Sequence, residues 1–216
     1  TTALGILGMP GFTAYSALLG PAQLQEGDVV LVSAASGAVG SMVGQIASIK
    51  NAKVIGIAGG QEKCQWTIKN ASMENCIDRK RDNIDQKLSE LCPHGVDIFF
   101  DNTGGEIQKI VLSNHIALNS RIILSGMISQ YNSSKPPSGP NLGNICKQRA
   151  IIFGFVVYDY EHMKESFIKD ALSWYKQGLL HYSEDLVFGI ENTPDHFVKL
   201  MKGENFGKTI VQFMDF

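Results

Sequence analysis

Three small residues lie close together early in the chain, in the pattern Ala35-x-Gly37-x-x-Gly40. An apolar run at 29–32 precedes them, and apolar residues at helical spacing follow from Met42 to Ile49. In such a strand-to-helix turn, Gly37 would let the backbone approach a pyrophosphate, and Gly40 would let the helix pack close to the strand. The phosphates would then face the free N–H groups of a helix that begins at Ala38. The pattern predicts a dinucleotide-binding loop with alanine at its first position.

The end of the next expected strand, at 53–57, indicates which dinucleotide the loop would take. NAD-binding sheets usually carry an acidic residue there, about 20 residues past the glycines, which binds the ribose hydroxyls. This chain has Gly56-Ile57-Ala58-Gly59-Gly60 instead, followed by Lys63 and by Arg79-Lys80-Arg81. A 2′-phosphate would find cations there and no repelling carboxylate, which favours NADP(H). The alternative is that these cations are solvated surface charges, since acidic residues are interleaved with them.

Cysteine and histidine spacing predicts no metal site. Cys64, Cys76, Cys92 and Cys146 are widely separated, and the chain contains no C-x-x-C and no H-E-x-x-H. No positively charged leader precedes the first apolar run. We therefore expect four reduced thiols in a cytoplasmic protein.

The bulk composition excludes several classes of protein. Of the 216 residues, 44% are hydrophobic and 19% are charged, which is typical of a soluble globular chain. The formal net charge of −2 gives no basic field that would attract nucleic acid or an acidic membrane. The charge-free stretch from Val29 to Ile49 is broken by serines, a glutamine and glycines, so it makes a poor membrane span. We expect neither nucleic acid nor a membrane as a partner.

Six short apolar runs alternate with helical patterns and would position the glycine loop. The runs are expected as strands at 29–32, 53–57, 76–77, 96–100, 121–124 and 151–157. Helices are expected from 38, over 62–70, over 84–91 and over 106–115. Strands buried on both faces with helical crossovers predict an α/β fold, a doubly wound, mostly parallel six-stranded Rossmann sheet.

The pattern changes after Val157. An amphipathic helix ends near Gly178, and short apolar segments, a helix at 194–201 and a last strand at 209–213 follow. We divide the chain into a dinucleotide-binding domain at 1–157 and a C-terminal helix–strand tail at 158–216. The chain starts at Thr1 without methionine and has no charge before Glu26, which we interpret as an interior segment of a longer protein.

Four strings of residues occur in the order in which one family carries them. They are Gly8-Met9-Pro10-Gly11-Phe12-Thr13-Ala14-Tyr15, Ser33-Ala34-Ala35-Ser36-Gly37-Ala38-Val39-Gly40-Ser41, Phe100-Asp101-Asn102-Thr103-Gly104-Gly105 and Gly203-Glu204-Asn205-Phe206-Gly207-Lys208. Together they resemble the zinc-independent medium-chain dehydrogenase/reductases, in the prostaglandin reductase and leukotriene hydroxydehydrogenase branch with its bacterial enone reductases. The resemblance covers essentially the whole chain. It implies hydride transfer from NADPH to the β-carbon of an α,β-unsaturated ketone or aldehyde.

The resemblance also implies cofactor contacts along the whole chain. On the phosphate and ribose side they are Gly37, Ala38, Val39, Gly40, Ser41, Lys63, Arg79 and Asn102. On the nicotinamide side they are Thr13, Ser125, Gly126, Ile128, Ser129, Phe155, Val156, Val157 and, from the tail, Asn205. Arg79 stands where the family often has tyrosine, and an arginine there would stack on adenine or pair with phosphate, so we expect NADP(H) affinity to survive.

Tyr131 matches the family's tyrosine near the substrate carbonyl, which makes it the candidate catalytic residue. Its hydroxyl would donate a hydrogen bond to the enolate oxygen as negative charge develops there. The alternative for Tyr131 is a loop anchor that packs on the strand end.

One departure from the family concerns the front of the chain. The family carries an amino-terminal catalytic domain before the Gly8-Met9-Pro10 segment, and this sequence lacks it. We therefore expect the cofactor-binding portion of an enone reductase acting on a small-molecule enone or enal. The alternatives are a nucleotide-binding fragment without turnover and a quinone oxidoreductase of the same superfamily. The apolar strand at 151–157 suits a sheet edge shared with a second copy, as in a homodimer.

Overall fold

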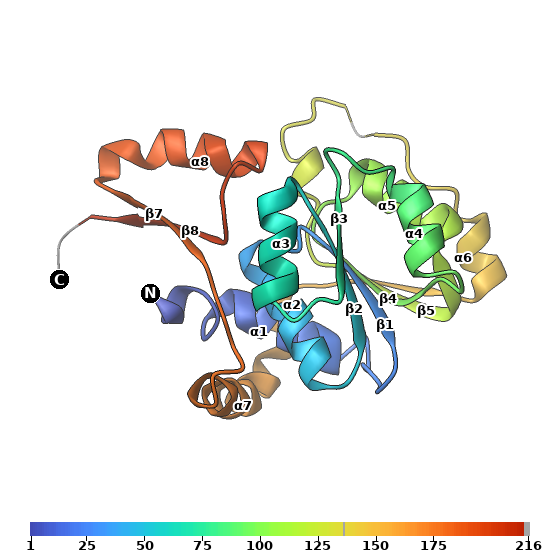
Figure 1. Ribbon diagram of the computed structural model, residues 1–216, viewed down its shortest axis with the longest axis horizontal. Helices are drawn as coiled ribbons and strands as arrows, with labels where there is room; N and C mark the ends of the chain where they lie inside the picture. The colour runs from blue at the N-terminus through green and yellow to red at the C-terminus, as the bar shows by residue number, and fades with distance from the viewer. Residues whose placement is uncertain (136, 214–216) are drawn as a thin grey trace.

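A six-stranded parallel sheet forms the centre of this computed structural model, which describes residues 1–135 and 137–213 (Figure 1). Its strands are β1 (Val29–Ser33), β2 (Lys53–Ala58), β3 (Asn75–Asp78), β4 (Val96–Asp101), β5 (Ile116–Leu124) and β6 (Ile151–Gly154). They lie in the order β3-β2-β1-β4-β5-β6, and every neighbouring pair is parallel. The expected doubly wound Rossmann sheet is confirmed. The strand order reverses between β1 and β4, the switch point at which such sheets bind ligands.

Helices cover both faces of the sheet, because side chains that alternate along each strand are apolar on both sides. On β1, Val30 and Val32 belong to one buried cluster and Leu31 to the other. The first face carries α1 (Met9–Leu19), α2 (Ala38–Ile49), α3 (Gln61–Asn70) and α7 (Lys164–Lys176). The second carries α4 (Ile84–Leu91), α5 (Gly105–Asn114) and α6 (Gly143–Gln148). Among the helices of the described residues, none is long and apolar enough to cross a membrane.

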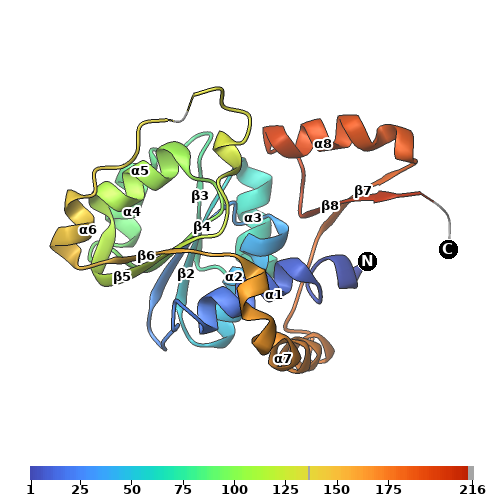
Figure 2. The same cartoon turned by 180° about the vertical axis from the view of Figure 1, so that it is seen from behind.

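The tail forms a small second sheet beside the first. β7 (Glu184–Phe188) pairs in parallel with β8 (Lys208–Gln212), and α8 (Thr193–Lys202) connects them. Figures 1 and 2 show this unit projecting on the side where α1 and α3 lie. The expected helix at 194–201 and last strand at 209–213 are each found within one residue of their predicted ends.

The sixth strand is shorter than expected, because it ends at Gly154 and not at Val157. The Phe155 N–H still donates to the Leu124 carbonyl of β5 at 3.0 Å, and its ring stacks on Tyr160 with 4.9 Å between the ring centroids. A 3₁₀-helix follows from Val157 to Met163. Aromatic packing and the helical turn that follows it therefore end the strand three residues before the apolar run does.

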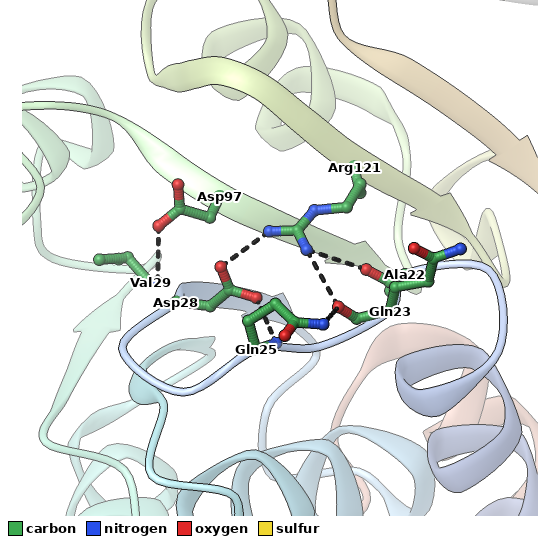
Figure 3. Close-up of polar contacts among 7 residues, drawn as sticks. All are labelled: Ala22, Gln23, Gln25, Asp28, Val29, Asp97 and Arg121. Atoms are coloured by element: carbon green, nitrogen blue, oxygen red, sulfur yellow. Dashed lines mark hydrogen bonds and ion pairs between the residues drawn. The ribbon is translucent and has the colours of Figure 1, made fainter.

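A half-buried ion pair ties the segment between α1 and β1 to β5 (Figure 3). Arg121 Nη2 donates to Asp28 Oδ1 at 2.8 Å, and Nη1 donates to the carbonyl oxygen of Ala22 at 3.0 Å. The two side chains are 19% and 11% exposed. Asp97 on β4 accepts from the Val29 N–H at 2.8 Å in the same region. This cluster joins three strands at the edge opposite the strand ends where ligands bind.

Replacing Arg121 with methionine should lower the free energy of unfolding. The substitution keeps most of the side-chain volume but leaves the Asp28 carboxylate and the Ala22 carbonyl without their donor, at a cost of about 2 kcal/mol. Urea unfolding measures the change. Lys87→Gln is the matched control, because its ion pair with Glu90 is exposed and contributes little. An Arg121→Met variant as stable as wild type would contradict this role.

Candidate functional site

The predicted glycine loop lies at the switch point, between the end of β1 and the start of α2. Gly37 precedes the helix in an extended conformation, and among the described residues no side chain caps it. The first intrahelical bond on this side comes from the Ser41 N–H to the Gly37 carbonyl, at 3.0 Å. The N–H groups of Ala38, Val39 and Gly40 therefore have no acceptor within the helix, which makes this helix start suitable for an anion.

Gly40 brings α2 close to the strand end. A Cβ atom at this position would lie 2.4 Å from the Ala34 carbonyl oxygen and 2.9 Å from the Ala35 Cα atom. Both neighbours are backbone, so they cannot move aside cheaply. This is the close helix–strand approach that the glycine pattern predicts.

Two of the predicted phosphate-binding cations meet at the end of β2. Lys63 Nζ donates to the carbonyl oxygen of Gly203 in the tail at 2.6 Å. The Arg79 guanidinium lies against Gly59 and Gly203. A Cβ atom added at Gly59 would lie 3.1 Å from Arg79 Nε, and one added at Gly203 would lie 3.3 Å from Arg79 Nη2. Burial, followed by repulsion from Lys80 and Arg79, lowers the pKa of Lys63. The cluster holds like charges close together, and an anion would relieve their repulsion.

Asp78 is a site residue that the sequence reasoning missed, because it counted this carboxylate among the interleaved surface charges. Asp78 is buried at the end of β3, and its Oδ1 accepts from the N–H groups of Gly60 at 2.7 Å and Lys80 at 3.0 Å. It thus orders the two turns that carry the cations. An aspartate side chain that accepts from the N–H two residues later forms a common type of turn. Asp78-Arg79-Lys80 is such a turn, so an aspartate directly after a predicted strand is the signal that could have found it.

Asn102 lies across the switch point from the glycine loop, at the end of β4. Its N–H donates to Ser33 Oγ at 2.8 Å, and its Nδ2 donates to the Ser33 carbonyl at 2.9 Å. Both bonds join β4 to the end of β1. Asn102 is therefore held beside the start of the glycine loop, where the resemblance expects a ribose contact.

The loop after β5 is bound to the same edge. Ser125 and Gly126 donate their N–H groups to the carbonyl of Asp101, at 2.9 and 3.1 Å. The Ile128 N–H donates to the Asn102 carbonyl at 3.3 Å, and the Ser129 hydroxyl donates to the Thr103 carbonyl at 2.6 Å. The expected nicotinamide-side residues of this loop thus lie next to the end of β4.

Tyr131 closes this loop on itself. Its hydroxyl oxygen accepts from the Met127 N–H at 3.2 Å, and its side chain is largely exposed. This contact lies within the loop, whereas the loop-anchor alternative expected Tyr131 to pack on the strand end. The bond from Met127 still leaves the hydroxyl hydrogen available to a second acceptor.

The remaining predicted residues differ in their exposure. Phe155 and Val157 are buried in the core of the first face, and Val156 between them is 55% exposed. Thr13 lies on α1, with 9% of its surface exposed. Asn205 Nδ2 donates to the Gly207 carbonyl at 3.1 Å. Of this group, Val156 presents the most surface to a ligand.

The tail loop that carries Asn205 lies against the dinucleotide-binding domain. A parallel bridge joins Gly207 to Gly37, and the Phe206 ring packs edge-on against Trp66 of α3 at 5.7 Å. A small pocket opens beside the start of α2, and two charged tail residues contribute to it. It is lined by Gly5, Ile6, Ala38, Ser41, Tyr182, Ser183, Glu184 and Lys208. The glycine loop and the tail therefore share one surface.

Within residues 1–135 and 137–213, no group of three or more His, Cys, Asp or Glu side chains is arranged to hold a metal ion. What the edge offers is a helix start without a cap, cations beside β2, and amide and hydroxyl groups beside β4. This set suits a phosphorylated dinucleotide laid across the strand ends.

Comparison with known proteins identifies the family. A family model described as "Zinc-binding dehydrogenase" matches residues 38–176. The chain is 39% identical to NADPH-dependent curcumin reductase of Escherichia coli (strain K12), over 97% of this chain and 62% of that protein. It is 41% identical to prostaglandin reductase 1 of Bos taurus, over 97% of this chain and 64% of that protein.

A solved structure gives the same relationship. CurA from Vibrio vulnificus in complex with NADPH superposes with a TM-score of 0.92 at 44% identity, over 99% of this chain and 65% of that chain. The chain thus spans between 62% and 65% of the length of these relatives. It belongs to the zinc-binding dehydrogenase family, within the medium-chain dehydrogenase/reductases, and its relatives in that family include reductases that use NADPH.

Proposed function

We propose that this chain is the NADP(H)-binding portion of an oxidoreductase that reduces the C=C bond of α,β-unsaturated ketones or aldehydes. The observation that carries the proposal is that an uncapped helix start and the Lys63–Arg79 pair meet along one sheet edge. The names of the relatives support it, since they include curcumin reductase, prostaglandin reductase and 2-alkenal reductase.

Each group at the edge has a distinct task in this proposal. The N–H groups at the start of α2 and the Ser41 hydroxyl hold the pyrophosphate, while Lys63 and Arg79 hold the 2′-phosphate. Asn102 binds a ribose hydroxyl. The nicotinamide half is bordered by Thr13, Ser125, Gly126, Ile128, Ser129, Phe155, Val156, Val157 and Asn205.

The chemistry divides between the cofactor and Tyr131. Bound NADPH supplies the hydride that goes to the β-carbon of the substrate. The Tyr131 hydroxyl donates a hydrogen bond to the carbonyl oxygen, on which negative charge accumulates as the β-carbon is reduced. The hydroxyl oxygen of Tyr131 accepts from the Met127 N–H, which fixes its position and leaves the hydroxyl hydrogen free to be donated.

The tail at 158–216 is proposed to dock on a further domain that carries part of the substrate site. Three large apolar side chains of the tail are each more than half exposed. They are Phe188 on β7, Ile190 in the turn that follows it and Phe197 on α8. Exposed apolar groups gathered on one unit mark an interaction surface. The chain alone would then bind the nucleotide without turnover.

A cytoplasmic homodimer completes the proposal. The cysteines are free, as expected for a reducing compartment. β6 lies at the edge of the sheet, and its Ile151 is 53% exposed. An apolar edge strand of this kind can pair with the same strand of a second copy.

The choice of coenzyme tests the phosphate-binding roles. Lys63→Gln and Arg79→Gln should each weaken NADPH binding by about 10- to 100-fold, because each removes a charge-assisted hydrogen bond to the 2′-phosphate. NADH binding should stay unchanged. Fluorescence titration gives both dissociation constants. Lys69→Gln, an exposed lysine on the same helix, is the matched control. A wild-type chain that binds no NADPH, or that prefers NADH, would refute the cofactor assignment.

The pKa of Lys63 predicts how this preference depends on pH. Burial and neighbouring cations lower that pKa in the free chain, and a bound 2′-phosphate would raise it. The preference for NADPH over NADH is therefore greatest at pH values below the lowered pKa of free Lys63, and it falls as the pH rises through that pKa. In Lys63→Arg the guanidinium stays protonated, so the ratio of the two dissociation constants should stay nearly flat. Parallel pH profiles for the two proteins would speak against this role of Lys63.

An NADPH oxidation assay distinguishes a complete enzyme from a chain that only binds the cofactor. With NADPH and 2-cyclohexenone, we expect binding of NADPH but little or no steady-state consumption, because the apolar face of the tail has no partner domain. NADPH oxidation is followed by absorbance. Rapid consumption would show that the chain is a complete enzyme, and product analysis would then distinguish alkene reduction from quinone reduction.

A further inference from the structure

Asp101 is a fully buried carboxylate at the end of β4, directly before Asn102. Its Oδ1 accepts from Ser33 Oγ at 2.8 Å, from the Thr103 N–H at 2.9 Å and from the Gly104 N–H at 3.0 Å. The Thr103 hydroxyl adds a longer bond at 3.2 Å. Its Oδ2 accepts from Gln108 Nε2 on α5 at 3.0 Å. Neutral donors therefore surround a charged group in the interior.

These bonds join several of the segments that border the switch point. Ser33 ends β1, and its hydroxyl oxygen also accepts from the Asn102 N–H at 2.8 Å. Thr103 and Gly104 form the turn into α5. The Ser129 hydroxyl, from the loop after β5, donates to the Thr103 carbonyl of this turn. One carboxylate thus links β1, β4, α5 and, through the turn, the loop that carries Tyr131.

The burial of a charge here needs a physical reason. Removing a carboxylate from water is costly, and a ring of hydrogen-bond donors offsets that cost only when every donor faces an acceptor. A carboxylate offers acceptors on both oxygens, whereas an asparagine amide of the same shape would turn a donor toward one of these groups. Gly104 and Gly105 have φ values of +66° and +63°, so the turn follows a left-handed path and directs its N–H groups inward.

We propose that Asp101 is a positioning residue for the cofactor, an inference that rests on the proposed function above. Its carboxylate keeps Asn102 against the end of β1 and holds the 103–104 turn on which the 125–129 loop docks. The edge is then preformed before the dinucleotide arrives, so the 103–104 turn and the 125–129 loop need not be ordered on binding. Asp101 itself is covered by these loops and contacts no ligand.

A paired substitution tests this role. In Asp101→Asn, Oδ1 still accepts from Ser33, Thr103 and Gly104, but the new amide nitrogen faces the amide nitrogen of Gln108. NADPH binding should weaken about tenfold. Adding Gln108→Glu supplies an acceptor opposite the new donor, so the double variant should return to within about threefold of wild type. Gln108→Glu alone, which sets two carboxylates together, should bind worse than the double variant.

Two measurements distinguish positioning from general stabilisation. NADPH dissociation constants are taken at a temperature where urea curves show each variant folded, and amide hydrogen exchange is followed at Thr103 and Gly104 without cofactor. We expect faster exchange in Asp101→Asn and slow exchange again in the double variant. An Asp101→Asn protein with lower stability but unchanged NADPH affinity would overturn the proposal, and so would a double variant as weak as the single one.

Two further results bear on the proposal, namely a wild type that binds no NADPH and an Asp101→Asn variant that does not fold. If wild type binds no NADPH, the proposed function fails, while unchanged exchange at Thr103 and Gly104 in Asp101→Asn would separately overturn the positioning role. If Asp101→Asn does not fold, Ser33→Ala replaces it, because it removes the one hydroxyl that donates to Asp101 Oδ1 and accepts from the Asn102 N–H, and leaves the other donors to Asp101 in place. That variant should fold and bind NADPH about threefold more weakly, and wild-type affinity in it would count against the proposal.

Discussion

The close approach of α2 to the end of β1 is the contact on which the site depends. At Gly40 the helix lies so near Ala34 that no side chain fits between them. Because of this approach, the helix begins directly at the switch point, and its first N–H groups are presented at the edge where β1 and β4 end. A larger residue would push the helix away and move the anion-binding end from the strands that carry the other groups.

The other groups reach this edge from strands on either side. Lys63 comes from α3, and β3 ends at Asp78, next to Arg79. The ends of β4 and β5 bring Asn102 and the 125–131 loop. Parallel pairing makes this possible, since all carboxyl ends meet at one edge. The turns between these elements are held by two buried aspartates, Asp78 and Asp101, which accept backbone N–H groups. The edge thus combines the Lys63 and Arg79 cations at its surface with two buried carboxylates that hold its turns.

The tail is also part of this arrangement. Lys63 donates to Gly203, Gly207 bridges Gly37, and Phe206 packs on Trp66. The tail therefore contacts both the helix start and the cation cluster, while its other side exposes apolar residues such as Phe188. The contacts of the tail with the rest of the chain therefore leave part of its apolar surface uncovered.

The sequence predicts the alternation of strands and helices, because burial on both faces of a parallel sheet leaves continuous apolar runs that can be recognised locally. It also located the glycine loop, whose spacing reflects a local turn, and the absence of an acid after β2. The tertiary structure alone decided the role of the aspartates, since Asp78 and Asp101 look like ordinary charged residues until distant donors such as Gln108 surround them. It likewise decided where β6 ends, because the Phe155 ring packs on Tyr160 and a 3₁₀-helix begins at Val157. Local spacing encodes turns and periodicity, whereas the partner of a buried charge or ring comes from another part of the chain and becomes apparent only after folding.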